Sequence, residues 1–121
     1  MPTSASAEAL ELRSVALLLR ALGDETRLRL VALLAHGELC VCHLHEALEL
    51  SQPLVSRHLA VLRAAGIVAD RRAGSWVHYR LVAQTDPERA RVLATLTEAF
   101  ARRAPVRRDL ARVKKSCGPE A

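Results

Sequence analysis

Apolar residues recur at helical spacing through most of this chain, and glycines interrupt the pattern at regular points. Leu, Val or Ala residues three or four positions apart form inner stripes, while Gly23, Gly37 and Gly66 follow the last residue of a stripe. Between the fourth and the last of these segments, the pattern favours two short strands joined by a turn that contains Gly74. The pattern predicts helices over 8–22, 25–36, from 40 or 41 to 48, 51–65 and 87–101, and strands over 67–71 and 76–82.

Two short helices joined by a three-residue turn, and followed by a hairpin, predict a winged helix-turn-helix. The fold class is therefore mainly α with a small β-hairpin wing. We expect a disordered N-terminus over 1–7, one DNA-binding and dimerisation domain over 8–101, and a basic C-terminal tail over 102–121. The N- and C-terminal helices have apolar faces that so small a unit does not bury, so we expect a homodimer formed through them.

Composition excludes several classes of protein. The longest apolar runs hold four or five residues, and no signal peptide is evident, so we expect a cytoplasmic protein with no membrane partner. Three cysteines are too few, and odd in number, for the disulfide framework of a secreted domain. The chain shows no Gly-rich phosphate loop, no Cys-x-x-Cys pair and no HExxH motif. We therefore expect a protein that is not an enzyme and needs no catalytic cofactor.

Positive charge is concentrated in the second half of the chain. The net charge is −3 over residues 1–50, but +4 over 51–82 and +4 over 83–121. This segregation over the predicted reading helix and wing favours a polyanionic partner, here double-stranded operator DNA. Arginine, glutamine, serine and histidine side chains left outside the core stripe can contact base edges or phosphates. The predicted DNA-binding residues are Gln52, Ser56, Arg57, His58, Arg63, Arg71, Arg72, Ser75 and His78.

Two cysteines, Cys40 and Cys42, lie directly before the predicted reading helix. Residues two positions apart in an α-helix point roughly 200° away from each other. If both cysteines lie in the helix that ends at Leu48, one ion that bridges both sulfurs would therefore have to deform the start of this helix, which supports the reading helix. The pair is typical of a chemical switch on a DNA-binding protein.

Five segments of residues 21–82 together form a recognisable pattern: Ala21–Leu28, Glu38–Cys42, Ser51-Gln52-Pro53, Ser56–Leu59, and Gly74 with Trp76–Leu81. With these segments, residues 21–82 resemble the arsenic-responsive (ArsR/SmtB) family of bacterial repressors. This resemblance implies a homodimeric repressor that leaves its operator on binding an inducer, which in the arsenic branch is trivalent arsenic or antimony held by thiolates. We therefore expect the repressor of an arsenic-resistance operon, with As(III) or Sb(III) as inducer.

The family motif Cys-Val-Cys-Asp-Leu-Cys assigns two inducer ligands to Cys40 and Cys42 and leaves the third open. His45 stands at the position of the third cysteine, and His43 replaces the aspartate. Trivalent arsenic prefers sulfur to imidazole, so His45 is the weaker candidate. Cys117 in the tail is the other candidate for the third ligand, unless it is only an exposed thiol. A site with two thiols would suit an organoarsenical such as methylarsenite.

Two other inducers remain open for the same fold. Cys40, Cys42, His43 and His45 are the residue types that bind tetrahedral zinc, although four ligands within six residues are tightly spaced. The family's zinc sensors use His and acidic residues on the last helix, yet no histidine follows His78; its cadmium sensors add N-terminal cysteines, yet none precedes Cys40. A Zn(II)- or Cd(II)-responsive repressor and a thiol-redox-responsive repressor are the alternatives to an arsenic sensor.

Overall fold

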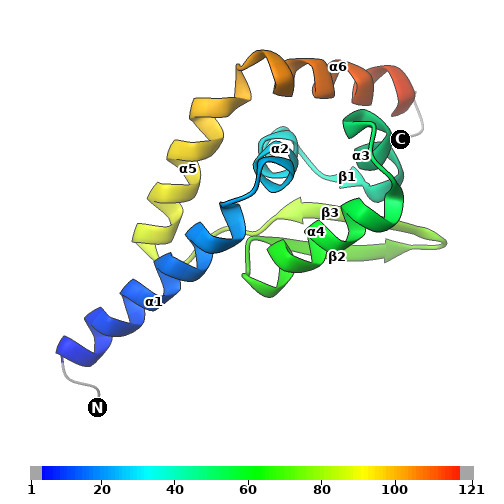
Figure 1. Cartoon of the computed structure of the whole chain (residues 1–121). Helices are drawn as coiled ribbons and strands as arrows, with labels where there is room; N and C mark the ends of the chain where they lie inside the picture. The colour runs from blue at the N-terminus through cyan, green and yellow to red at the C-terminus, as the bar shows by residue number, and fades with distance from the viewer. Residues whose placement is uncertain (1–3, 118–121) are drawn as a thin grey trace.

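A small sheet lies on one side of the molecule, and the helices pack beside it (Figure 1). The computed structural model describes residues 4–117, with side chains placed for residues 11–113. None of the described helices is both long and apolar enough to cross a bilayer. The elements, in chain order, are α1 (Ser4–Leu22), α2 (Glu25–Leu34), β1 (Leu39–Cys40), α3 (Val41–Leu48), α4 (Gln52–Ala64), β2 (Val68–Ala73), β3 (Trp76–Leu81), α5 (Pro87–Ala101) and α6 (Ala104–Cys117).

Side-chain caps fix where the helices of the central motif begin. Asp24 caps α2, because its carboxylate accepts hydrogen bonds from the backbone N–H groups of Thr26 (2.8 Å) and Arg27 (3.1 Å). Ser51 caps α4 through the N–H of Leu54 at 3.3 Å. These caps, with the apolar stripes, place the helices of the predicted helix-turn-helix within one or two residues of their expected bounds.

The wing is the hairpin β2–β3, and a third strand extends it. Arg71 lies opposite His78 in the antiparallel hairpin. Strand β1 pairs with the other edge of β3, so the sheet order is β1-β3-β2 and Cys40 lies opposite His78. The sequence did not predict β1. It joins the wing directly to the start of α3.

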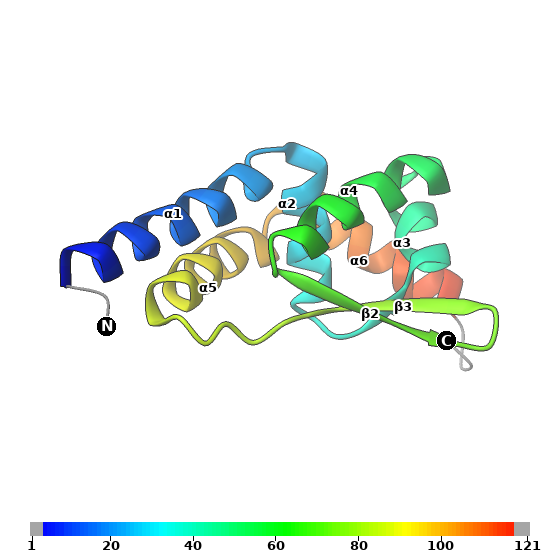
Figure 2. The ribbon, with the colours of Figure 1, turned by 90° about the horizontal axis from the view of Figure 1, so that it is seen from below.

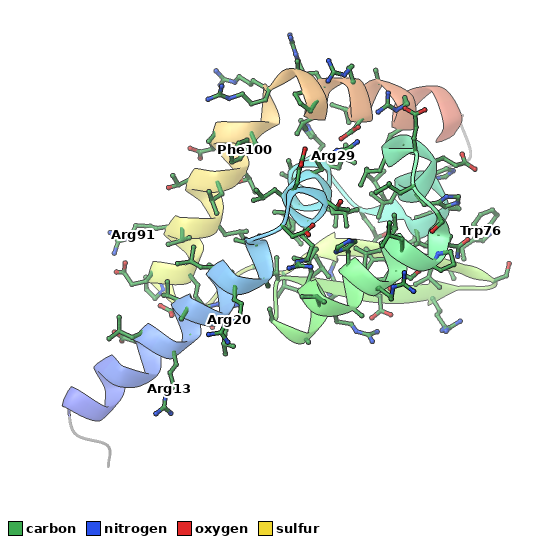
Figure 3. The ribbon with its side chains drawn as sticks, in the orientation of Figure 1. Arg13, Arg20, Arg29, Trp76, Arg91 and Phe100 are labelled. Carbon is green, nitrogen blue, oxygen red and sulfur yellow. The ribbon has the colours of Figure 1, made fainter. Side chains whose placement is uncertain are left out.

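The core is aliphatic and fills the space between α2, α3, α4 and the sheet (Figures 1 and 2). Ile67 and Val68 carry it from the end of α4 into the wing, and Tyr79 is the buried aromatic of β3. Trp76 is half exposed at the hairpin (Figure 3). The completely buried leucines are Leu18, Leu30, Leu33, Leu44, Leu59 and Leu62.

The two ends of the chain differ from expectation. Helix α1 begins at Ser4, inside the stretch 1–7 that was expected to be disordered. Most of the expected basic tail forms helix α6, which packs on α3 and α2 across the side of the molecule away from the wing (Figure 1). Helix α5 ends at Ala101, and Pro105 lies in the first turn of α6, where its missing N–H has no helical partner.

Candidate functional site

The two thiols of Cys40 and Cys42 already lie together at the start of α3. Cys40 is the residue before the helix, with an extended backbone (φ −73°, ψ 144°), and its sulfur accepts a hydrogen bond from the N–H of Cys42 at 3.3 Å. The two Sγ atoms are 2.7 Å apart. The expectation that one ion could bridge them only by deforming α3 is wrong. The 200° separation holds for two helical residues, and Cys40 is outside the helix.

The environment keeps the Cys42 thiol protonated. Burial raises the pKa of the Cys42 thiol to about 12, and its hydrogen bond to Cys40 and the nearby Glu46 carboxylate raise it as well. Cys40 is buried and Cys42 is half-buried, and both are free thiols. Cys42 is therefore a neutral thiol at ordinary pH, and it lies close to the Cys40 sulfur.

Of the two histidines near the thiols, His43 joins the cluster and His45 does not. The donor atoms of Cys40, Cys42 and His43 all lie within 4.8 Å of one another. The ring of His45 instead lies with Nδ1 3.2 Å from the carbonyl oxygen of Leu50, in the turn between α3 and α4. Cys117, the other candidate for a third ligand, lies outside the residues whose side chains the structure describes. Two thiols and one imidazole can hold a soft or borderline metal or metalloid.

The predicted reading residues on α4 separate into two groups. Gln52 and Arg57 are exposed and Ser56 is half-buried, on the helix that lies over the wing (Figure 2). His58 points toward α2, where its Nδ1 is 3.1 Å from Arg27 Nη1 and 3.8 Å from the Asp24 carboxylate. Its ring joins α4 to the start of α2.

On the wing, Arg72 and Ser75 are exposed near the hairpin turn, and His78 is half-buried. Arg71 forms a two-armed ion pair with Glu38, with its shortest contact at 2.6 Å. This hydrogen bond to Arg71 lowers the pKa of the Glu38 carboxyl.

Arg63 of α4 is bound to Asp70 of β2 at 3.1 Å. Both Arg63 and Arg71 were predicted to face DNA. Because each arginine is paired with a carboxylate in the structure, it would have to exchange that carboxylate for a phosphate to contact DNA. The sequence did not show these two ion pairs.

Three contacts join the thiol cluster to the reading elements. Cys40 pairs with His78 across the sheet, so Cys40 and the wing share one strand ladder. Val41 begins the support helix α3 directly after it. At the far end of α3, His45 contacts the turn before α4. A change at the two sulfurs therefore reaches both the wing and the turn that leads into the reading helix.

Sequence reasoning missed a charged network that holds the other end of α3. The Asp109 carboxylate of α6 is completely buried and accepts hydrogen bonds from Arg29 (2.9 and 2.7 Å) and Arg112 (2.9 Å). Arg112 also donates to the carbonyl oxygen of Ala47, near the end of α3, at 2.6 Å. The apolar spacing of Val106, Leu110 and Val113 was the signal that could have revealed this helix.

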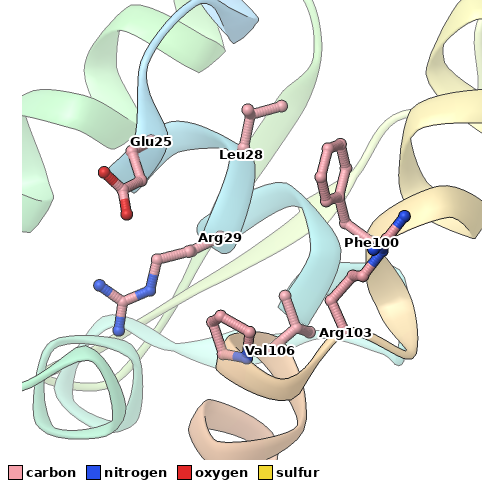
Figure 4. A pocket seen from close by; sticks show the side chains of 7 residues that line it. Glu25, Leu28, Arg29, Phe100, Arg103 and Val106 are labelled. Carbon is pink, nitrogen blue, oxygen red and sulfur yellow. The ribbon is translucent and has the colours of Figure 1, made fainter.

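A pocket of about 160 Å³ lies between α2 and the junction of α5 and α6 (Figure 4). Leu28, Phe100 and Val106 form its apolar wall, and Glu25 and Arg29 lie on α2. Its lining contains no thiol and no imidazole, so this pocket offers nothing to a thiophilic inducer.

Known proteins share both this sequence and this fold. Residues 24–70 match the model of the "Bacterial regulatory protein, arsR family". The reduced HlyU structure from Vibrio cholerae N16961 is 32% identical, with a TM-score of 0.67 over 78% of this chain and 96% of that one. The chain belongs to the arsR family. Family members are regulatory proteins rather than enzymes, and the winged helix-turn-helix fold is confirmed.

Two further relatives of this arsR-family chain carry names that mention arsenic or antimony. The "Arsenical resistance operon repressor" of Escherichia coli K12 is 60% identical over 65 residues, which are 53% of this chain and 56% of that protein. The structure of the "AntR antimony-specific transcriptional repressor" is 36% identical, with a TM-score of 0.56 over 77% of this chain and 78% of that one. This chain spans just over half the length of the curated arsenic-resistance relatives it matches.

Proposed function

We propose that this protein is a homodimeric transcriptional repressor that binds operator DNA and leaves it when As(III) or Sb(III) binds Cys40 and Cys42. The observation that carries the proposal is the thiol pair, 2.7 Å apart, at the junction of the support helix and the wing. The arsenic and antimony repressors among its relatives support the choice of inducer. The exposed side chains of Gln52, Arg57, Arg72 and Ser75 are the first candidates for contacts with DNA.

Arsenous acid can react with two thiols that lie this close together. Two S–H groups condense with As(OH)₃, so two As–S bonds form, two As–O bonds break, and the thiol protons leave with hydroxide as two water molecules. The raised pKa of Cys42 does not prevent this step, because the net reaction consumes thiols and needs no free thiolate. The third arsenic position keeps a hydroxyl group or takes one more donor, for which Cys117 is the sulfur candidate. Methylarsenite, with only two exchangeable positions, needs no third donor.

Release of DNA follows from where the two sulfurs are attached. Bound arsenic would fix the distance and angle between the two sulfurs at the start of α3. The Cys40 sulfur, which accepts a hydrogen bond from the Cys42 N–H without arsenic, would then be bonded to arsenic. The start of α3 and the end of β1 adjust together, and the pairing of Cys40 with His78 carries the change to the wing. A coupling of about 1–3 kcal/mol gives a 5–150-fold loss of affinity.

Dimerisation follows from the apolar surface of α1, which runs beside α5 (Figures 1 and 2). Leu12 and Leu19, seven residues apart on one face of α1, are 73% and 48% exposed, and exposed apolar side chains that lie together mark interaction surfaces. A two-fold dimer through α1 and α5 would bury them. The two copies of α4 would then address half-sites about one helical turn, ~34 Å, apart.

Zinc or cadmium is a second candidate inducer, because His43 joins the two thiols in the structure. Two sulfurs, one imidazole and a water molecule complete a tetrahedral zinc site. His45, which was the fourth ligand of this alternative, contacts Leu50 instead. If zinc or cadmium is the inducer, we expect the divalent ion to release the DNA from wild type and from Cys117→Ser alike.

The deciding experiment is a fluorescence-anisotropy titration of a DNA duplex that the wild-type protein has selected from a random pool. The complex is challenged under reducing conditions with arsenite, antimonite, methylarsenite, zinc and cadmium. We expect arsenite to release wild type but not Cys40→Ser or Cys42→Ser, although both variants still bind the duplex. Cys117→Ser is the matched control: retained release makes Cys40 and Cys42 sufficient, while loss of the arsenite response alone identifies Cys117 as the third ligand.

The result also separates the alternatives. Release by zinc or cadmium at concentrations where arsenite has no effect would replace the arsenic proposal with the divalent-metal one. A failure of Cys40→Ser and Cys42→Ser to bind DNA would show that the cysteines maintain the fold, and the switch proposal would be wrong.

A further inference from the structure

Arg89, in the first turn of α5, joins three separate parts of the chain. Its guanidinium is 9% exposed and donates from all three nitrogens. Nη1 donates to the carbonyl oxygen of Ser14 in α1 at 2.8 Å and to the Ser14 hydroxyl at 3.2 Å. Nη2 donates to the carbonyl oxygen of Ala65, the residue that ends α4, at 2.5 Å, and Nε donates to Gln84 at 2.8 Å.

No carboxylate balances this buried cation among the described residues, whose ion pairs all involve other groups. Its counter-charge is the C-terminal end of α4, where unpaired carbonyl groups and the helix dipole give a partial negative charge. The contact with Ala65 therefore does more than fill space. The favourable position for the Arg89 guanidinium depends on where the reading helix ends.

Gln84 completes the clamp on the same end of α4. Its Oε1 accepts from Arg89, and its Nε2 donates to the carbonyl oxygens of Gly66 and Val82, each at 2.9 Å. Gly66 has a positive φ of 74°, and a Cβ there would meet Arg89 Nη2 at 3.7 Å. Arg89 and Gln84 together hold the exit of the reading helix, the end of the wing and α1.

We propose that Arg89 is the positioning residue that sets the placement of the reading helix α4 relative to α1 and α5. This inference rests on the proposed dimeric binding of DNA, in which α1 and α5 form the two-fold contact. The two copies of α4 then reach successive half-sites only if each is held at a fixed place on the dimer frame. Arg89 contacts the backbone at the end of α4 and none of the side chains predicted to contact bases.

This role separates two quantities that a general loss of stability would change together. Affinity for one isolated half-site depends on the face of α4. The gain from a second half-site depends on how well the separation of the two readers matches the duplex. Arg89→Lys keeps the charge, but its single nitrogen cannot reach at once the separate acceptors that Nε, Nη1 and Nη2 of the guanidinium contact. We expect the gain to fall while half-site affinity is kept.

The test compares dimers of wild type, Arg89→Lys and Arg91→Lys on three kinds of duplex. The duplexes carry one selected half-site, two half-sites at the selected spacing, or two half-sites with one or two base pairs added or removed. Arg91, on the same helix, is the matched control, because it is exposed and pairs with Glu88 at the surface. Circular dichroism and sedimentation define conditions in which every variant is folded and dimeric.

For Arg89→Lys we expect the gain from the second half-site to fall about tenfold or more, with a broader spacing optimum and half-site affinity within about twofold of wild type. Arg91→Lys should match wild type throughout. If Arg89→Lys does not fold, Gln84→Leu replaces it in the same measurements. This substitution removes one acceptor of Arg89 and the contacts of Gln84 with Gly66 at the end of α4 and with Val82 at the end of the wing.

An equal loss of half-site and full-site affinity, or an unchanged spacing optimum, would overturn the inference while wild type still binds DNA. Failure of the proposed function itself would appear in wild type, as an absence of any selected duplex.

Discussion

The two ends of the support helix α3 are held by different chemistry. At its start, the cap is a sulfur atom, with Cys40 accepting one hydrogen bond from the Cys42 N–H at 3.3 Å. At its end, Arg112 donates to the Ala47 carbonyl at 2.6 Å and is itself bound to the buried Asp109. A thiol is a weak acceptor, whereas hydrogen bonds from charged groups are about twice as strong as neutral ones. The helix is fixed at one end and lightly held at the other.

This asymmetry suits a switch. An inducer that binds the start of α3 works against one weak hydrogen bond and a two-residue strand, while Arg112, itself bound to Asp109, keeps the far end of the helix on α6. Movement is then concentrated where α3 meets the wing. If the charged network were at the sulfur end, the inducer would have to break it first. The predictions below change one end at a time.

The largest expected effect is at Asp109. Asp109→Ala removes the buried carboxylate that Arg29 and Arg112 contact. Because both arginines retain some solvent contact, we expect the free energy of unfolding to fall by about 2–3 kcal/mol, less than for a fully buried pair. Urea unfolding measures the change. Asp70→Ala is the control, since its ion pair with Arg63 is largely at the surface and should contribute under about 1 kcal/mol. Equal losses in the two variants would show that the far end of α3 is not specially held.

The next effect concerns the cap itself. Cys40→Ala removes the acceptor for the Cys42 N–H and should lower the free energy of unfolding by about 1 kcal/mol. Cys40→Ser supplies a hydroxyl, which is a preferred helix cap, so its free energy of unfolding should lie within about 0.5 kcal/mol of wild type. Both substitutions remove a sulfur and should abolish arsenite binding. Urea unfolding with and without arsenite separates the two roles. A Cys40→Ser protein as unstable as Cys40→Ala would show that packing of the sulfur, and not capping, matters at this position.

Local signals account for how much of the fold the sequence predicted. Asp24 and Ser51 are good caps, and the apolar stripes after them are long enough to define α2 and α4. Strand β1 has two residues and no local signal, because it exists only through its pairing with β3. Helix α6 was hidden by its arginines, whose charge suggested a tail although Val106 and Val113 are buried.

The candidate site was predicted in composition but not in geometry. Whether Cys40 lies inside α3 or immediately before it decides whether the thiols diverge or meet, and sequence patterns place a helix boundary only to within a residue or two. His43 entered the cluster and His45 left it for the same reason, since each position around α3 follows from where the helix starts. The clamp at Arg89 joins residues up to 75 positions apart and has no signature in the local sequence.

The smallest effect on stability, and the sharpest test of the lightly held end, is the reactivity of Cys42. With a pKa of about 12, roughly one thiol in ten thousand is ionised at pH 8, and alkylation proceeds through the thiolate. The rate of iodoacetamide labelling at Cys42, followed by peptide mass spectrometry, should therefore rise about tenfold per pH unit from 7 to 10 without levelling off. In Cys40→Ser, without the sulfur that accepts its proton and opposes its charge, Cys42 should react faster at every pH. If the labelling rate of Cys42 in wild type levelled off near pH 9, Cys42 would be an ordinary exposed thiol. The start of α3 would then react with any electrophile, instead of being selective for an atom that bonds both sulfurs at once.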